Sequence, residues 1–159
     1  MKRFSILALI VAGLTMATIS SCSKDDSSSN SGSTVDSRDL SIGTYIGTYT
    51  SVFSGQTNTD STGFIITKGA NNTISISEDG INIATSAVTS SGTNFKANIP
   101  AQTIKVFNET DSTEMTFNII GNGNNHVSFE SSSKRFTYSF KIVGGQVDGL
   151  VVETTGVKQ

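Results

Sequence analysis

The sequence predicts an all-β domain, folded as an antiparallel up-and-down meander of about 8–10 strands. Through short windows of the domain, apolar residues alternate with threonine, serine or asparagine, as in a sheet with one wet face. Turn-forming pairs such as Asp79-Gly80 and Gly144-Gly145 separate these windows. No window of about 11 residues in the domain places apolar residues at helical spacing. These patterns favour a closed or nearly closed barrel, with a β-sandwich as the alternative.

The expected strands follow the alternating windows in chain order. They cover residues 44–53, 63–68, 73–77, 81–84, 94–99, 103–107, 114–120, 126–130, 135–142 and 146–154. The turns between them contain glycine or asparagine, which adopt positive φ at little cost, as in Asn71-Asn72, Ser91-Gly92 and Gly121-Asn122-Gly123.

Alternation with a period of two assigns one side of each strand to the interior. The aromatic residues on that side are candidates to pack the core or to face a bound ligand: Tyr45, Tyr49, Phe64, Phe95, Phe117, Phe136, Tyr138 and Phe140. Met115 and Ile119 are expected on the same side as Phe117. Burying one phenylalanine side chain stabilises a fold by about 1.5–3 kcal/mol, so this set suffices for a core.

The first 21 residues have the pattern of a secretory signal. Met1, Lys2 and Arg3 form a cationic start, and residues 4–17 are almost wholly apolar. That run is shorter than the about 20 apolar residues that a transmembrane helix needs. We therefore expect residues 1–21 to be a signal peptide, in preference to an uncleaved membrane anchor.

The signal ends in Ile19-Ser20-Ser21-Cys22, which resembles the bacterial lipobox. The resemblance implies that Cys22 receives a diacylglyceryl thioether and becomes the acylated first residue after cleavage. Cys22 is the only cysteine, so it has no disulfide partner within the chain. Because each buried acyl methylene adds about 0.8 kcal/mol, two or three chains hold a protein firmly on a membrane. The alternative is an ordinary cleaved signal with an incidental cysteine.

Lys24, Asp25 and Asp26 follow almost directly after the cysteine. A lysine followed by two acidic residues resembles the export signal of Bacteroidetes-type surface lipoproteins. The resemblance implies a lipid-anchored protein exposed on the outer face of the outer membrane. The alternative is that these residues are simply the polar start of a linker.

Residues 22–39 are expected to form a flexible tether, because they are rich in serine and aspartate and contain almost no apolar surface to bury. Residues 40–159 then make one domain. The chain has 11 basic and 13 acidic residues, and loss of Lys2 and Arg3 with the signal makes it more acidic. This charge argues against nucleic acid as a partner and against electrostatic binding to anionic lipid. The expected membrane contact is the lipid on Cys22.

Three stretches of the domain resemble small lipocalin-like lipoproteins of the Bacteroidetes type. They are Gly43-Thr44-Tyr45-Ile46-Gly47-Thr48-Tyr49, Asn98-Ile99-Pro100-Ala101-Gln102-Thr103-Ile104, and Phe136-Thr137-Tyr138 followed by Gly144-Gly145-Gln146. The resemblance implies an up-and-down β-barrel with an apolar cavity for a small ligand.

Residues with catalytic or metal-binding chemistry are sparse. His126 is the only histidine; it suits a general base for a serine nucleophile, but an exposed strand residue beside Asn124-Asn125 is the favoured interpretation. Asn108, Glu109, Asp111 and Glu114 form the densest acidic group, yet they lack the spacing of a calcium loop and are interpreted as a solvated turn. We expect no catalytic residue, metal or cofactor, and no enzyme activity.

Two triplets, Asp60-Ser61-Thr62 and Asp111-Ser112-Thr113, resemble the O-glycosylation acceptor of Bacteroidetes-type exported proteins. The resemblance implies Ser61 and Ser112 as modification sites, although such triplets also arise by chance in a chain rich in serine and threonine.

Two hypotheses for function follow. The first is a non-enzymatic surface lipoprotein that binds a small apolar or amphipathic molecule inside a lipocalin-like barrel. The second is a glycan- or protein-binding accessory module of a surface complex, which acts through exposed loops or a sheet face. A cavity above roughly 300 Å³ inside the barrel would favour the first hypothesis. The sequence leaves the oligomeric state open.

Overall fold

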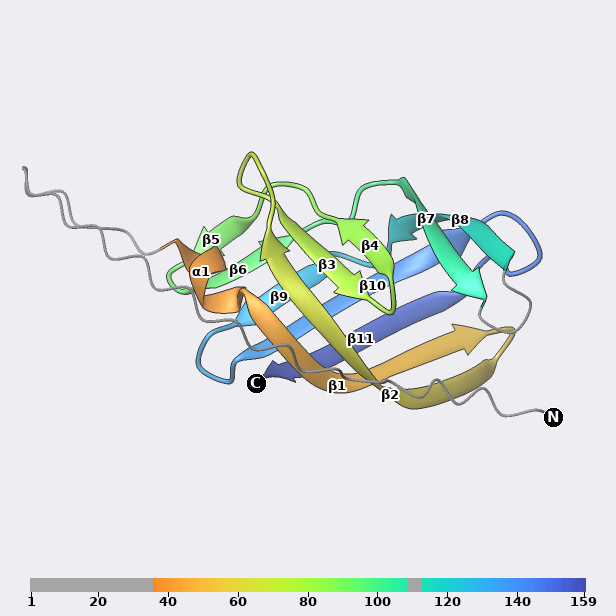
Figure 1. Ribbon diagram of the computed structural model, residues 1–159, viewed down its shortest axis with the longest axis horizontal. Helices are drawn as coiled ribbons and strands as arrows, with labels where there is room; N and C mark the ends of the chain where they lie inside the picture. The colour runs from red at the N-terminus through yellow and green to blue at the C-terminus, as the bar shows by residue number, and fades with distance from the viewer. Residues whose placement is uncertain (1–35, 109–112) are drawn as a thin grey trace, which may run out of the picture. The chain divides into compact units, whose positions relative to one another are not determined.

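The computed structural model describes residues 36–108 and 113–159, and they form a nearly all-β fold (Figure 1). The elements are α1 Ser37–Ser41, β1 Gly43–Phe53, β2 Gln56–Lys68, β3 Ile74–Glu78, β4 Ile81–Ala84, β5 Thr89–Ser91, β6 Asn94–Ala97, β7 Gln102–Asn108, β8 Thr113–Gly121, β9 Val127–Glu130, β10 Arg135–Val143 and β11 Val151–Lys158. Every strand pair is antiparallel, as the sequence predicts.

The strands form one curled sheet in the order β4-β3-β2-β1-β11-β10-β9-β6-β5. Outside this order, β8 pairs with β10 on one side and with β7 on the other. β10 pairs with β9 through Arg135–Tyr138 and with β8 through Phe140–Val143. β8 and β9 therefore act as one strand interrupted at residues 122–126, and β6 and β7 as one strand interrupted around Pro100. With these two kinked strands counted once each, the order is the predicted meander, and β11 pairs back onto β1.

The remaining seam of the curled sheet lies between β4 and β7. The Gln102 amide bridges it, because its Oε1 accepts a hydrogen bond from Ala84 N at 3.0 Å and its Nε2 donates to Ala84 O at 2.8 Å. The backbone N–H of Ser86 donates to Asn98 O at 2.8 Å beside the same seam. These hydrogen bonds close much of the gap without a continuous strand ladder.

The core lies on the inner face of the sheet, where the side chains predicted to point inward gather. Tyr45, Phe64, Phe95, Phe136, Tyr138 and Phe140 are all buried, together with aliphatic residues of β3, β4, β8 and β9. Tyr49 and Phe117 are half-buried. The expectation that Met115 packs inside is wrong, since its side chain is 41% exposed. The reason is that β8 pairs with β10 only from Asn118 onward, so its first half lies beyond the core.

Several strand boundaries differ from the predicted ones where the alternation signal is missing. β2 begins at Gln56 instead of residue 63, because its first half is wholly polar and pairs only with β1. β5 was not expected, since its three residues are all polar. β11 is shifted toward the C-terminus from 146–154, because the residues after Val143 form turns in which Gly144 N donates to Asp148 Oδ1 at 2.7 Å.

α1 corrects the expected end of the tether at Asp39. Asp36 caps the helix by accepting a hydrogen bond from Arg38 N at 3.0 Å. The Arg38 guanidinium donates to the backbone oxygens of Gly69 and Thr73, and Lys68 pairs with Asp36 at 3.1 Å. The last residues of the serine- and aspartate-rich stretch thus belong to the folded domain because polar contacts, not apolar burial, hold them.

Candidate binding surfaces

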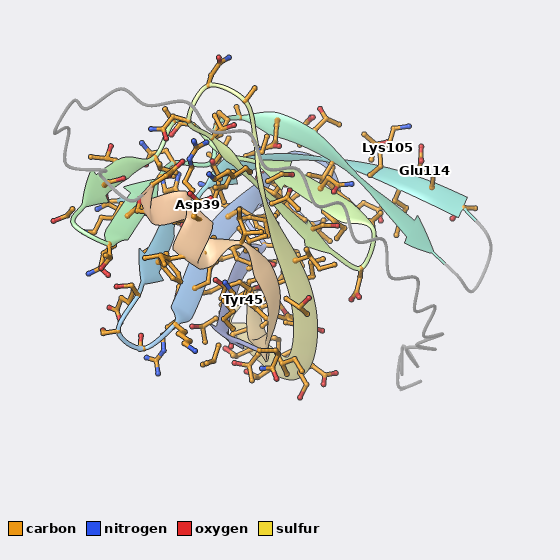
Figure 2. All side chains as sticks on the ribbon, turned by 60° about the vertical axis from the view of Figure 1, so that its left-hand side comes forward. Asp39, Tyr45, Lys105 and Glu114 are labelled. Atoms are coloured by element: carbon orange, nitrogen blue, oxygen red, sulfur yellow. The ribbon has the colours of Figure 1, made fainter. Side chains whose placement is uncertain are left out.

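The aromatic side chains on the inner face pack against one another. The Tyr45 and Phe64 rings stack with centroids 5.1 Å apart, and Phe136 lies tilted against both at 5.5 and 5.9 Å. Phe95 continues the cluster, 6.2 Å from Phe136 and 5.6 Å from Phe129. Figure 2 shows Tyr45 within this dense set of inner side chains. Rings at these separations fill each other's contact surfaces, so the aromatic set acts as packed core.

A carboxylate lies at the edge of this aromatic cluster. Glu78, the last residue of β3, accepts hydrogen bonds from the hydroxyl groups of Thr62 and Tyr138. Desolvation raises the pKa of Glu78 above its ordinary value, the two hydrogen bonds oppose the rise, and the nearby charge of Asp79 adds to it. Both carboxylate oxygens are therefore engaged within the fold.

The tyrosines around this carboxylate stay protonated at physiological pH. Burial, followed by the charge and the hydrogen bond of Glu78, strongly raises the pKa of Tyr138. Burial also raises the pKa of Tyr49, with further contributions from Asp60, Glu78 and Asp79. Tyr138 is thus a hydrogen-bond donor here, and it orients the carboxylate.

A second tyrosine has a purely structural partner. Tyr45 OH donates to the backbone oxygen of Ser41 at 2.7 Å, and burial raises the pKa of the Tyr45 phenol strongly. This hydrogen bond joins the C-terminal end of α1 to the aromatic core. The Tyr45 ring is therefore fixed by its aromatic neighbours, and its hydroxyl group by Ser41.

An open hollow of about 480 Å³ lies over β5 and β6. Its lining is dominated by short hydroxyl and amide side chains, with one charged residue: Ser86, Ala87, Thr89, Ser90, Ser91, Asn94, Phe95, Lys96, Ala97, Asn98 and Asn125. Phe95 is 1% exposed, so its ring belongs to the core and contributes little to the hollow's surface. The hollow is therefore lined mainly by polar residues, but it exposes both polar and apolar atoms. The sequence did not indicate it, because the three polar residues of β5 carry no alternation signal.

Part of this lining is already held in place by hydrogen bonds. Asn94 Oδ1 accepts from Ser131 N at 2.9 Å, Ser86 Oγ accepts from Asn98 N at 3.1 Å, and Ser90 Oγ lies 2.7 Å from Ser37 Oγ. The side chains of Lys96 and Asn98 make no hydrogen bond to the described part of the chain. Some side chains of the hollow are thus fixed by hydrogen bonds within the fold, whereas those of Lys96 and Asn98 can bind a ligand.

A second hollow, of about 370 Å³, lies where the β3–β4 turn faces the β7–β8 hairpin. Asp79, Asn82, Lys105 and Glu114 contribute its polar lining. Lys105 Nζ pairs with Glu114 at 2.7 Å, and both side chains are well exposed on β7 and β8 (Figure 2). Glu114 belongs to the acidic group that the sequence analysis interprets as a solvated turn, and its carboxylate is paired with Lys105 on the β7–β8 hairpin.

His126 has a structural position that differs from the exposed strand residue expected for it. Its Nδ1 accepts a hydrogen bond from Ile99 N at 3.0 Å, and its Nε2 lies 2.7 Å from Gly123 O. The first contact requires an unprotonated Nδ1, so Nε2 carries the proton and donates. The imidazole thereby connects the interruption between β8 and β9 to the interruption between β6 and β7. No serine hydroxyl in the described residues contacts it.

Several predicted sites lie outside the described residues: Cys22, Lys24, Asp25, Asp26 and Ser112. Ser61 lies on the exposed half of β2, and its backbone N–H donates to Asp60 Oδ1 at 2.7 Å. Among the described residues, no group of three or more histidine, cysteine or acidic side chains is arranged to hold a metal ion.

No protein-family model, curated protein or solved structure matches this chain. Within the described residues no helix has the length and apolar character to cross a membrane.

Proposed function

We propose that this protein is a non-catalytic binding module held at the cell surface by lipid on Cys22, and that it recognises a carbohydrate in the hollow over β5 and β6. The observation that carries the proposal is the division of the domain into an interior packed with aromatic rings and an open hollow of about 480 Å³ lined mainly by serine, threonine and asparagine. That volume falls within the range of about 300–1,000 Å³ typical of small-molecule sites.

The lining of the hollow suits a polyhydroxylated ligand. Serine, threonine and asparagine side chains donate and accept hydrogen bonds over short distances, as sugar hydroxyl groups require. Lys96 is the only charged side chain in the lining, and it favours an acidic sugar over a basic one. We infer that an acidic oligosaccharide, for example one built from uronic acids, is the best-matched ligand class.

The interior supports this choice over the small apolar ligand of the lipocalin-like hypothesis. A ligand between Tyr45, Phe64 and Phe136 would have to separate rings whose centroids lie 5.1–5.9 Å apart. Because such packing contributes several kcal/mol, the ligand would have to replace all of it. A ligand on the outer hollow displaces only water.

The binding proposal is tested by calorimetric titration of the protein with an oligogalacturonate and with neutral maltohexaose. Lys96→Ala should weaken binding of the oligogalacturonate by about tenfold, the equivalent of about 1.4 kcal/mol. Lys141→Ala is the matched control, since it removes one lysine charge from β10, away from the hollow, and it should leave the affinity unchanged. Absence of binding to both oligosaccharides, or equal losses in the two variants, would contradict the proposal.

The anchoring proposal has its own measurement. The intact mass of the protein purified from the membrane of its native host should correspond to a chain that starts at Cys22 and carries acyl groups. A mass without acyl groups would contradict lipid anchoring and leave a freely secreted domain.

A further inference from the structure

The first half of β2 presents an unusually regular free edge. β1 pairs with β2 along its whole length, from Gly43 opposite Ile66 to Phe53 opposite Gln56, without a bulge. β3 pairs with β2 only from Phe64 onward. Residues 56–63 therefore have β1 on one side and no strand on the other within the described ranges (Figure 1).

Two other edges of the same sheet carry covering contacts, whereas residues 114–117 of β8 pair only with β7 among the described strands. The Gln102 amide bonds to both the N and the O of Ala84 at the edge of β4. Ser37 of α1 contacts Ser90 of β5 through their hydroxyl groups. Natural sheets block free edges in such ways because an uncovered edge is a template for another strand.

The edge formed by residues 56–63 lacks most of the protection that free edges usually carry. It contains no proline, lysine or arginine, and Asp60 is its only charge. The backbone N–H of Ser61 donates to the side chain of its own neighbour, Asp60 Oδ1, at 2.7 Å. A backbone donor is thus satisfied locally at a position where an adjoining strand would supply a carbonyl oxygen.

We propose that a second copy of this chain pairs with this edge, strand β2 against strand β2, antiparallel and centred on Thr59. The two-fold axis places Thr59 opposite its equivalent and Asp60 opposite Asn58, so the two acidic side chains do not face each other. Thr57 lies opposite Ser61 in the same register. Cross-strand threonine, serine and asparagine pairs stabilise such a ladder, whereas like charges directly opposite would destabilise it.

The proposed interface is small, because it consists of two edge strands and their polar side chains. We expect weak association in solution, since interfaces that bury less than about 1,200 Å² are typical of transient complexes. This inference is independent of what binds over β5 and β6, and anchoring on a membrane would only raise the effective concentration of the copies.

The test compares Thr59→Lys with Thr50→Lys in the full chain purified in detergent. Thr50 Oγ1 and Thr59 Oγ1 lie 3.2 Å apart across β1 and β2, so both variants lose the same contact. Only Thr59 lies on the free edge, and there two lysines would meet across the axis. Sedimentation equilibrium to about 1 mM protein should show a dimer for the parent chain and for Thr50→Lys, and at least about tenfold weaker association for Thr59→Lys.

Amide hydrogen exchange identifies the interface directly. The amides of Thr57 and Thr59 should become protected in the parent chain as concentration rises, and the Thr57 amide should remain unprotected in Thr59→Lys. A monomer throughout the concentration range would overturn the proposal, as would a dimer that Thr59→Lys leaves intact. Protection of these amides in a monomer would also overturn it, since the edge would then be covered by the chain's own residues.

Discussion

The two halves of the β1–β2 hairpin share one continuous register but differ in almost every other respect. In the half next to α1, Tyr45, Phe64 and Ile66 are fully buried beneath the curled sheet. In the other half, residues 56–61 of β2 are all exposed and polar. Glu78 and Thr62 mark the transition between the halves, where the last contact of β3 with β2 is a side-chain hydrogen bond.

This difference shows that two separate interactions maintain the hairpin. Apolar burial fixes the half near α1, whereas the backbone ladder with β1 alone extends β2 to the two-residue turn at Ser54 and Gly55. Both turn residues have positive φ, 48° and 77°, as the tight primed turns that suit twisted strands require. Substitutions in the two halves should therefore have very different costs.

The largest effect is expected at the ring shared by the aromatic cluster. Phe136→Ala removes a fully buried ring that contacts Tyr45, Phe64, Phe95 and Tyr138, so the free energy of unfolding should fall by about 3–5 kcal/mol. Phe53→Ala, at the half-buried end of the hairpin, should cost about 1 kcal/mol or less. Urea unfolding of both variants measures the difference, and equal losses would contradict the division of the hairpin.

A smaller loss is expected where the hairpin approaches β11. An added Cβ at Gly47 would overlap the backbone oxygen of Thr155 and the Cα of Gly156, so Gly47→Ala should destabilise the fold by about 3 kcal/mol. Gly63→Ala is the matched control on β2, since the nearest atom to its Cβ would be Tyr45 O at 3.7 Å. Thermal unfolding should leave the control within about 0.5 kcal/mol of the parent.

A double-mutant cycle at His126 and Gly121 tests how the interruption between β8 and β9 is packed. His126→Ala leaves Ile99 N–H without its acceptor and should cost about 1–2 kcal/mol. Gly121→Ala should also destabilise, because its Cβ would overlap the imidazole. In the double variant the cost of Gly121→Ala should fall, since the ring is gone; simple additivity in chemical unfolding would show that the imidazole does not occupy this space.

The smallest effect concerns pH at the transition between the halves. Because the folded-state pKa of Glu78 is raised, its contribution to stability is complete below the ordinary glutamate range, about pH 4.3, and is lost as pH rises through the raised pKa. Glu78→Gln should remove this loss, leaving the variant within about 1 kcal/mol of the parent at pH 7. Unfolding curves from pH 4 to pH 8 measure it, and an unchanged pH dependence in the variant would argue against a raised pKa.

The sequence predicts the elements that are held by apolar burial and misses those that are held by polar hydrogen bonds. The all-β antiparallel class and the burial of Tyr45, Phe64 and Phe136 were predicted correctly, because a half-buried sheet imposes alternation on the sequence. The first half of β2, β5 and α1 were missed because polar backbone and side-chain hydrogen bonds form them, and these leave no apolar period. The hollow over β5 and β6 was missed for the same reason, and the role of His126 depends on Ile99 and Gly123, which alternation does not connect to it.

Aromatic packing fills the interior, and the proposed ligand binds outside it. The most direct measurement is an NMR titration of the protein, in separate samples, with an oligogalacturonate and with dodecanoate. We predict that the oligogalacturonate shifts resonances of Ser86, Lys96 and Asn98, while dodecanoate leaves the ring resonances of Tyr45, Phe64 and Phe136 unchanged. Specific, saturable shifts of those rings with dodecanoate would contradict the account and restore an internal apolar site.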